Sequence, residues 1–220
     1  MSALIDLSHA ISHGMVTYRG LPGPIICDYL SREASTANYE GGTQFQIGRI
    51  DLVANTGTYV DCPFHRYADG KDLSQTALEH FVDLPVVCVH VPHRERLAVT
   101  EHDFAHVEVK GRAVLVHTGW SEHWGTGAYF EQHPFLTEGA ASALRDRGAV
   151  LVGIDSHNID DTRTRNARPV HSVLLRHEVL IVEHLTGLEQ LKGKSFAFSA
   201  VPPKFVGVGT FPVRAFARVA

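Results

Sequence analysis

Four short and almost entirely apolar segments constrain the fold of this chain more than any other feature. They are residues 84–91, 113–116, 149–155 and 179–182. Continuous apolar runs of this length are typical of strands that are covered on both faces, as in the parallel and mixed sheets of α/β proteins. The sequence therefore predicts a mixed β-sheet whose central strands are buried.

Two helices are predicted between these strands. Thr137 is followed by an acid at Glu138, by Arg145 and Arg147 in the last turn and by a stop at Gly148, which are the signals of a capped helix. Pro169 opens a second, shorter helix that runs to Arg176.

Shorter strands and loops complete the expected chain. Strands are predicted at residues 4–9, 43–53, 195–201 and 213–219, with a bulge near Gly48 and with the last strand at a sheet edge or in a partner's interface. Residues 14–24 and 121–134 are rich in glycine and are expected to be loops. The sequence shows neither an internal repeat nor a linker, so residues 1–220 are expected to form one α/β domain with more strand than helix.

The charge and the cysteine content of the chain limit which partners it is expected to bind and in which compartment it is expected to work. A net charge of -4 gives no basic surface for a phosphate backbone, so nucleic acid is not expected as a partner. Cys27, Cys62 and Cys88 are an odd number without a Cys-x-x-Cys pair, which argues against a disulfide framework or a cysteine zinc site. We see no signal-peptide pattern and no apolar run of about 20 residues. The expected protein is cytoplasmic and has no membrane partner.

The stretch from Asn55 to His65 contains the main candidates for chemistry. Gly57 permits a tight turn, and Tyr59 and Asp61 would share one face of an extended segment. An aspartate and a histidine at this spacing can bind a metal or form a base with its orienting carboxylate. The alternative is an aspartate that caps loop amides beside an exposed histidine.

This stretch resembles the signature His-x-Gly-Thr-His-x-Asp-x-Pro-x-His of the cyclase family of metal-dependent hydrolases, which includes bacterial kynurenine formamidases and isatin hydrolases. Asn55 and Tyr59 stand where the family has its first two histidines. The resemblance continues through nearly the whole chain, including residues 5–9, 153–160, 171–175 and 180–183. It implies the α/β fold of that family, a swivelling β/β/α-like domain in which helices flank a mixed sheet.

The resemblance also implies which residues form the site. In the family two metals share ligands, and Asp61, His171 and Glu183 match one complete metal site. His65 matches the general acid/base. At the other site Asn55 offers only a weak amide oxygen and Tyr59 a poor phenol ligand, so one divalent metal, zinc or manganese, is expected instead of two.

Other side chains are weaker candidates for the site, because each of them could instead have a purely structural role. Tyr59 could donate a hydrogen bond to an oxyanion, and Phe64, Trp120 and Trp124 could line a substrate pocket or simply pack. His157 and His117 are candidates for an added ligand or proton carrier, or for structural residues. Three arginines could bind a substrate carboxylate or lie in a solvated loop. They are Arg163, Arg165 and Arg168.

The resemblance implies a hydrolase that cleaves a C–N bond of a small amide or lactam. Relatives that form dimers or tetramers imply a homo-oligomer. Two alternatives remain open on the residues alone. One is a metal-poor family member that binds a small molecule without catalysis, which the changes at Asn55 and Tyr59 favour. The other is a metal-dependent lyase, dehydratase or cyclase.

Overall fold

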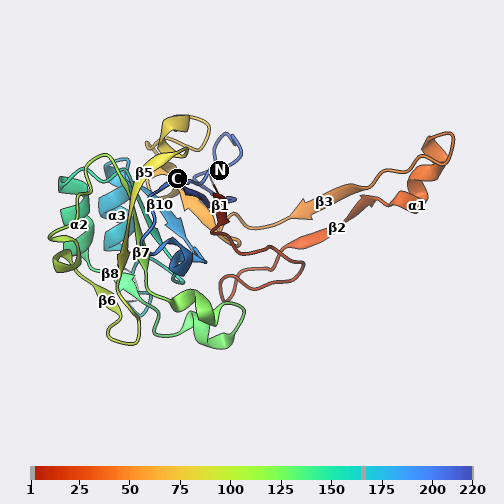
Figure 1. Ribbon diagram of the computed structural model, residues 1–220. Helices are drawn as coiled ribbons and strands as arrows, with labels where there is room; N and C mark the ends of the chain where they lie inside the picture. The colour runs from red at the N-terminus through yellow and green to blue at the C-terminus, as the bar shows by residue number, and fades with distance from the viewer. Residues whose placement is uncertain (1–2, 165–166, 220) are drawn as a thin grey trace.

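The computed structural model describes residues 3–164 and 167–219. Within them, nine strands form one mixed sheet in the order β1-β13-β11-β5-β7-β9-β10-β4-β12 (Figure 1). The strands of this sheet are β1 (Ala3–Asp6), β4 (Tyr59–Asp61), β5 (Leu84–His90), β7 (Ala113–His117), β9 (Leu151–Ile154), β10 (Leu180–Glu183), β11 (Phe196–Ser199), β12 (Thr210–Pro212) and β13 (Phe216–Val219). Two small sheets pair β2 (Ile25–Leu30) with β3 (Ile47–Asp51) and β6 (Ala98–Val99) with β8 (Phe135–Leu136).

The four apolar segments form the parallel centre of the sheet, as the sequence predicts. β5 pairs with β7, β7 with β9 and β9 with β10, all in parallel. Strands β4, β11, β12 and β13 join on either side in antiparallel pairs. β4 comes from the Asn55 to His65 stretch, and it lies directly beside β10.

Alternate residues of the central strands face two separate cores. Val114, Val152 and Ile181 belong to the core beneath the helices, whereas Leu115 and Val182 belong to the core on the opposite face. The second core also contains side chains from β13 and β4, which are near opposite ends of the sheet. The sheet therefore curls around this core.

Helices α2 (Glu138–Asp146) and α3 (Pro169–Arg176) cover one face of the sheet, and α1 (Arg32–Ser35) lies far from it (Figure 1). Thr137 caps α2 by accepting a hydrogen bond from the amide of Ala140 at 3.1 Å, as predicted. None of the helices within residues 3–164 and 167–219 combines the length and apolarity that a membrane span requires.

Two predictions on local structure were wrong. The strand at 213–219 is not at an edge, because β1 pairs with the outer side of β13. β3 is shorter than predicted and does not join the main sheet, and the register irregularity lies in β2 between Asp28 and Leu30, across from Gly48. The segment 121–134 is a loop that contains two short 3-10 turns, at Trp120–His123 and Gly127–Phe130.

Candidate active site

A cavity of about 330 Å³ opens beside the point where β4, β10 and α3 meet. Its walls contain most of the side chains that the signature and the later motifs predicted. The lining residues are Tyr18, Leu21, Asn55, Tyr59, His65, Arg66, Asn158, Arg168, His171 and Glu183.

The register of β4 sets the geometry of this site. Tyr59 is paired across the strands with Glu183, and Asp61 is paired with Thr210 of β12. Residues that are directly opposite each other in antiparallel strands have neighbouring side chains. Accordingly, the Tyr59 hydroxyl donates to Glu183 Oε2 and the Thr210 hydroxyl donates to Asp61 Oδ1.

His171 is held at the start of α3 by Asp160. Asp160 Oδ1 accepts a hydrogen bond from the Val170 amide at 2.8 Å, and its Oδ2 accepts one from the His171 amide at 3.1 Å, so it caps the helix from outside. Asp160 Oδ2 also lies 2.6 Å from His171 Nδ1. Because a carboxylate only accepts, Nδ1 carries the proton and donates. His171 Nε2 then faces Asp61 Oδ2 at 3.7 Å and Glu183 Oε1 at 3.8 Å.

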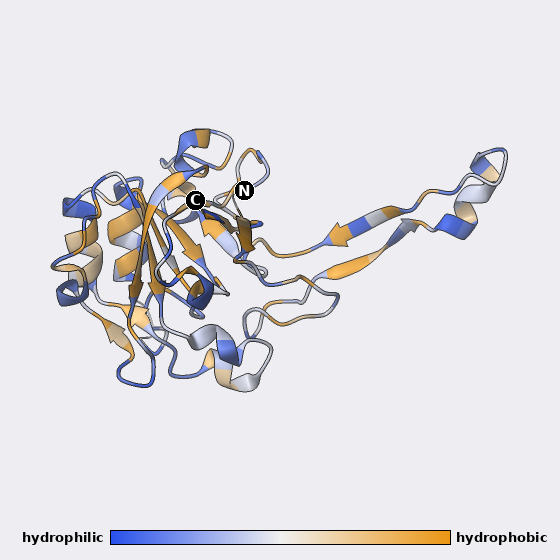
Figure 2. Ribbon diagram, in the orientation of Figure 1, coloured by the Kyte–Doolittle hydropathy of each residue, from blue (hydrophilic) through white to orange (hydrophobic). Residues whose placement is uncertain are grey.

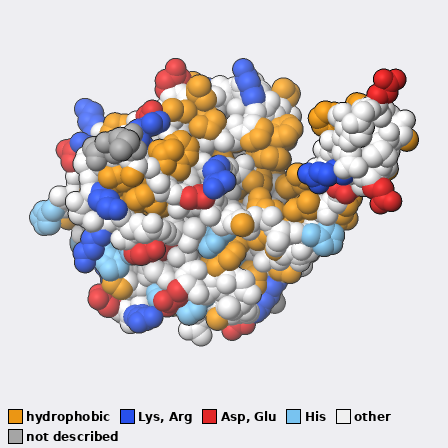
Figure 3. All heavy atoms as spheres, turned by 45° about the vertical axis from the view of Figure 1, so that its right-hand side comes forward, with side chains coloured by type: hydrophobic (Ala, Val, Ile, Leu, Met, Phe, Trp, Pro, Cys, Tyr) orange, Lys and Arg blue, Asp and Glu red, His pale blue; other side chains and the backbone are white. Residues whose placement is uncertain are grey.

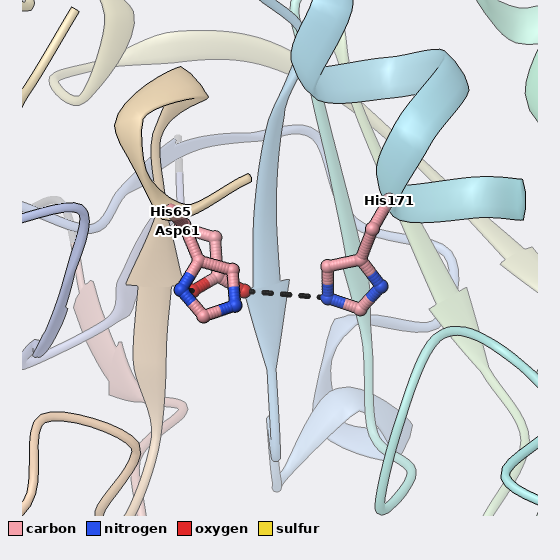
Figure 4. A group of neighbouring side chains, drawn as sticks. All are labelled: Asp61, His65 and His171. Carbon is pink, nitrogen blue, oxygen red and sulfur yellow. Dashed lines mark ion pairs between the residues drawn. The ribbon is translucent and has the colours of Figure 1, made fainter. Parts of the chain in front are cut away.

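His65 points into the same site from the turn that follows β4 (Figure 4). Its Nδ1 lies 2.6 Å from the Thr210 hydroxyl oxygen. The single Thr210 proton is donated to Asp61, so the hydroxyl must accept from the Nδ1–H of His65. His65 Nε2 is therefore left with a free electron pair. One ligand atom each from Asp61, His65 and His171 lie within 4.8 Å of one another.

Glu183 is buried and is hydrogen-bonded at both carboxylate oxygens. Oε1 accepts from the Ile159 amide at 2.6 Å. Oε2 accepts from Tyr59, and the Tyr18 hydroxyl lies 3.4 Å away. Burial and the neighbouring Glu183 raise the pKa of both tyrosines well above the usual value, so both hydroxyls remain protonated donors. The phenol of Tyr59 thus supports Glu183 from the position of a family histidine.

The charged side chains of the site shift one another's pKa values. Burial alone would lower the pKa of His171, but the hydrogen bond to Asp160 and the negative charges of Asp61 and Glu183 raise it to about 10. Burial alone would raise the pKa of Asp61, but His65 and His171 lower it. Burial raises the pKa of Glu183 to about 7 despite the nearby His171. Three buried carboxylates within reach of one imidazole make a site that attracts cations.

The other predicted pocket residues lie outside the lining of this cavity. Phe64 packs against the core on the curled face of the sheet. The indole N–H of buried Trp120 donates to the Tyr129 carbonyl at 3.1 Å. His157 is buried among the rings of Tyr18 and Phe130, and burial lowers its pKa to about 3.

Of the remaining candidates that the structure describes, Arg168 lines this cavity and the others do not. His117 stacks on His90 and lines a different cavity. Trp124 stacks on His9 with ring centroids 3.9 Å apart. Arg163 pairs with Asp161 at 2.8 Å, Arg165 lies outside the described residues, and Arg168 lines the cavity.

Sequence reasoning missed four residues that shape this site: Tyr18, Arg66, Asp160 and Thr210. Asp160 lies inside the family-like segment 153–160, and Tyr18 follows the family-like residues 5–9, so the sequence held a signal for both. Thr210 becomes visible only through the pairing of β12 with β4.

Comparison with known proteins assigns the family. The model of the Cyclase family, described as "Putative cyclase", matches residues 5–161. The chain belongs to the Cyclase family. Two relatives, kynurenine formamidases of Bacillus cereus and Bacillus mycoides, are 27% and 26% identical over 217 residues, which are 99% of this chain and 98% of each relative.

Solved structures of Cyclase family type have the same fold. A potential metal-dependent hydrolase with cyclase activity is 25% identical, with a TM-score of 0.79 over 100% of this chain and 99% of that one. A predicted metal-dependent hydrolase from Bacillus stearothermophilus is 26% identical, with a TM-score of 0.75 over 99% and 98%. Isatin hydrolase A from Ralstonia solanacearum, at 23% identity, shares the fold with a TM-score of 0.83 over 100% and 92%.

Proposed function

We propose that this Cyclase family member is a metal-dependent hydrolase that cleaves the C–N bond of a small amide or lactam. One divalent ion, zinc or manganese, would be held by Asp61, His171 and Glu183, and His65 would serve as general acid/base. The names of the relatives and of the similar structures point to aryl formamides and isatin-like cyclic amides as the first substrates to test.

The observation that carries this proposal is the set of ligand atoms that Asp61, His171 and Glu183 bring together beside the cavity. Asp61 Oδ2 is buried and has no hydrogen-bond partner among the described residues. A buried carboxylate oxygen without a partner is costly, and a cation would compensate for it. His171 Nε2 faces this oxygen because Nδ1 is bonded to Asp160. An imidazole and two carboxylates fit a catalytic zinc site with an open position, and they also suit manganese.

The chain's own residues account for the movement of protons. When bound, the ion would polarise the substrate carbonyl and lower the pKa of a nearby water to about 7. His65 Nε2 would take a proton as the water oxygen bonds to the carbonyl carbon. His65 would return that proton to the nitrogen as the C–N bond breaks. The Tyr59 proton is already donated to Glu183, so Tyr59 and Asn55 would contact the substrate mainly as walls of the cavity.

Two arginines support a substrate that carries a carboxylate. Arg66 and Arg168 both line the cavity, and within the described chain neither forms an ion pair with an acidic side chain. Arg66 Nε donates to the Ser172 hydroxyl at 3.3 Å, and one amino group of Arg168 donates to the carbonyls of Thr164 and Ala167. The remaining N–H groups of both guanidiniums can bind a carboxylate.

Elemental analysis of the purified protein tests the metal site. The expected content is about one zinc or manganese per chain, with strong loss in Asp61→Asn and Glu183→Gln. A wild-type protein that holds no stoichiometric metal, and takes up none when zinc or manganese is added, would point to a binding protein without catalysis. The hydrolase proposal would then be abandoned.

A second experiment tests the role of His65. His65→Ala should keep its metal and lose about 10²- to 10⁴-fold in turnover, the usual contribution of a general acid/base. Equal loss of metal would make His65 a ligand, which its position within 4.8 Å of the Asp61 and His171 ligand atoms would permit. Product analysis on formanilide and isatin distinguishes hydrolysis, which yields a carboxylate and an amine, from lyase chemistry.

We also propose that residues 1–220 work as one domain in the cytoplasm and assemble as a homo-oligomer, either a dimer or a tetramer. All three cysteines are free, which fits a reducing compartment. Exposed apolar side chains on β2 and β3 fit an oligomer.

A further inference from the structure

Two histidines and a glutamate converge where the chain leaves β5 and β7. Because these strands are parallel neighbours, the chain leaves both at the same edge of the sheet. His93 follows β5, and Glu122 and His123 belong to the 3-10 turn after β7. One ligand atom from each of the three residues lies within 4.8 Å of the other two. The three residues are distinct from those that line the candidate active site.

A sharp bend at Gly119 brings these side chains together. Gly119 has a φ of 78°, in the left-handed region that glycine adopts without strain. A Cβ at this position would lie 3.5 Å from His93 Nδ1, so the bend runs close to the imidazole. Figure 2 shows that the chain changes here from the apolar strand β7 to a mostly polar segment. The bend thus places the polar turn that contains Glu122 beside His93.

His93 is oriented as a metal ligand would be. Its Nδ1 lies 3.0 Å from the carbonyl oxygen of Thr118. Because a carbonyl only accepts, Nδ1 carries the proton of the neutral ring and donates it. Histidines that bind metals commonly donate their other ring N–H to a backbone carbonyl in this way. The free electron pair is then on Nε2, which faces Glu122 Oε1 at 3.3 Å.

The spacing of the ligand atoms fits one small cation. Glu122 Oε1 lies 3.3 Å from His93 Nε2 and 3.6 Å from His123 Nε2. Ligand atoms that are each about 2.1 Å from a tetrahedral zinc ion lie about 3.4 Å from one another. Two imidazoles and a carboxylate are also a donor set that zinc, nickel and copper accept. An ion could therefore bind all three residues with little movement of their side chains.

Arg94 is the group that competes with a cation for Glu122. One of its amino groups lies 3.1 Å from Glu122 Oε1 and 3.3 Å from Oε2. This hydrogen bond and the charge of Arg94 lower the pKa of Glu122, so the carboxylate is charged. The Arg94 side chain is 76% exposed, and an ion pair that is exposed in this way contributes little stability. A divalent ion can therefore displace Arg94 from the carboxylate.

We propose that His93, Glu122 and His123 bind a divalent transition-metal ion, such as zinc, nickel or copper, at a site separate from the candidate active site. Figure 3 shows histidine side chains at several places on the surface of the body, so a surface histidine is not evidence by itself. This cluster differs because two imidazoles face one carboxylate oxygen and a backbone carbonyl orients one of the rings. The ion would connect the segment after β5 to the turn after β7. The site does not depend on the proposed hydrolase activity.

An ion at this site would exchange with the solvent. The side chains of Glu122 and His123 are 45% and 32% exposed, and three protein ligands leave a position for water. We expect dialysis to remove the ion. The metal content of the dialysed protein then reflects only the buried site of Asp61, His171 and Glu183.

Trp120 provides a reporter beside the site. Its ring centroid lies 5.2 Å from that of His93 and 4.5 Å from that of His123. Nickel has unpaired d electrons and quenches tryptophan fluorescence at such short range, whereas zinc has a filled d shell and does not. The chain has one other tryptophan, Trp124, which stacks on His9. Trp124→Phe keeps an aromatic ring there and leaves Trp120 as the single reporter.

Titration of the full-length Trp124→Phe protein with nickel chloride tests the proposal. The emission should fall at least twofold and saturate, and excess zinc should restore it. Glu122→Gln and His93→Gln in this background should each raise the half-saturating nickel concentration at least tenfold. The reason is that removing a group that merely orients a metal ligand already costs about 10- to 100-fold in affinity. Far-UV circular dichroism checks that each variant folds.

Two further variants serve as controls. His102→Gln alters another histidine that faces a glutamate at the surface, with His102 Nε2 3.7 Å from Glu101 Oε1, and should titrate like its parent. Glu183→Gln removes a ligand of the candidate active site and should leave the quenching unchanged. Emission that does not respond to millimolar nickel would overturn the proposal and leave the cluster as an ion pair. Quenching that is lost in Glu183→Gln but kept in Glu122→Gln would also overturn it, because the ion would then be in the candidate active site.

Discussion

Asp160 and His171 are joined by a hydrogen bond of 2.6 Å from the imidazole Nδ1–H to the carboxylate, and the same carboxylate caps α3. The contact fixes the tautomer of His171 and directs Nε2 towards Asp61. A carboxylate behind a histidine in this way increases the basicity of the imidazole as a metal ligand. Asp160 is thus a positioning residue for the candidate metal site.

Asp160→Asn should therefore weaken the binding of zinc by about 10- to 100-fold. The amide oxygen can still accept from the backbone, but only one oxygen remains for the three donors that Asp160 serves. Competition with a chromophoric chelator measures the affinity. Asp161→Asn is the matched control, because Asp161 is the next residue and pairs with Arg163 at the surface. Equal affinities of Asp160→Asn and wild type would contradict the assigned role.

Restoring the family histidines should create a second metal site. The double variant Asn55→His/Tyr59→His places two imidazoles on the cavity wall, where this chain has a weak amide ligand and a phenol hydrogen-bonded to Glu183. The expected metal content rises from about one to about two zinc ions per chain, measured by elemental analysis after dialysis. Tyr59→Phe keeps the ring without adding a ligand and should remain near one. A double variant that also stays near one would show that the lost histidines do not limit metal content.

The candidate site could be predicted largely because short motifs carry it. Asp61, His171 and Glu183 are far apart in the sequence, yet each follows a recognisable pattern, and the structure brings all three to the junction of β4, β10 and α3. The aromatic residues were harder to place. A tryptophan in a glycine-rich segment has the same pattern whether it lines a pocket or, like Trp120, bonds to a neighbouring carbonyl.

Residues that depend on strand pairing could not be read from the sequence. The role of Thr210 follows from its register opposite Asp61, which is set by a contact over 149 positions. The exposure of β2 and β3 was missed for a related reason. Nearly every residue of both strands is exposed, and the apolar residues of a strand do not tell whether the same chain covers them.

Thr210→Val should reduce turnover by about 10- to 100-fold while leaving folding intact. Valine has a similar shape but cannot accept the Nδ1–H of His65 or donate to Asp61, so His65 loses its fixed tautomer. The pH–rate profile should change along with kcat, because the substitution alters a proton acceptor and not the fold alone. Thr210→Ser retains the hydroxyl and should restore most of the activity and the wild-type pH profile. An unchanged profile in Thr210→Val would mean that Thr210 does not orient the base.

Acid should destabilise the metal-free protein through its buried histidines. Burial lowers the pKa of His157 to about 3 and that of His9 to about 4, from an ordinary value near 6.5. The unfolded chain therefore binds protons that the folded chain does not. The stability contributed by these neutral side chains is complete above pH 6.5 and is lost as the pH falls towards 4. Each such histidine adds up to about 1.4 kcal/mol per pH unit to this loss.

His157→Phe isolates one of these protons. His157 Nδ1 is buried without a hydrogen-bond partner in the described chain, and the ring packs among aromatic side chains, so phenylalanine can occupy the same space. Urea unfolding in EDTA at pH 7.5, 6 and 5 should show a smaller loss of stability in acid than in the wild type, by about 1 kcal/mol per unit. His102→Phe, at a side chain that is 87% exposed, should keep the wild-type pH dependence. Parallel curves for wild type and His157→Phe would mean that His157 does not remain neutral in the folded protein.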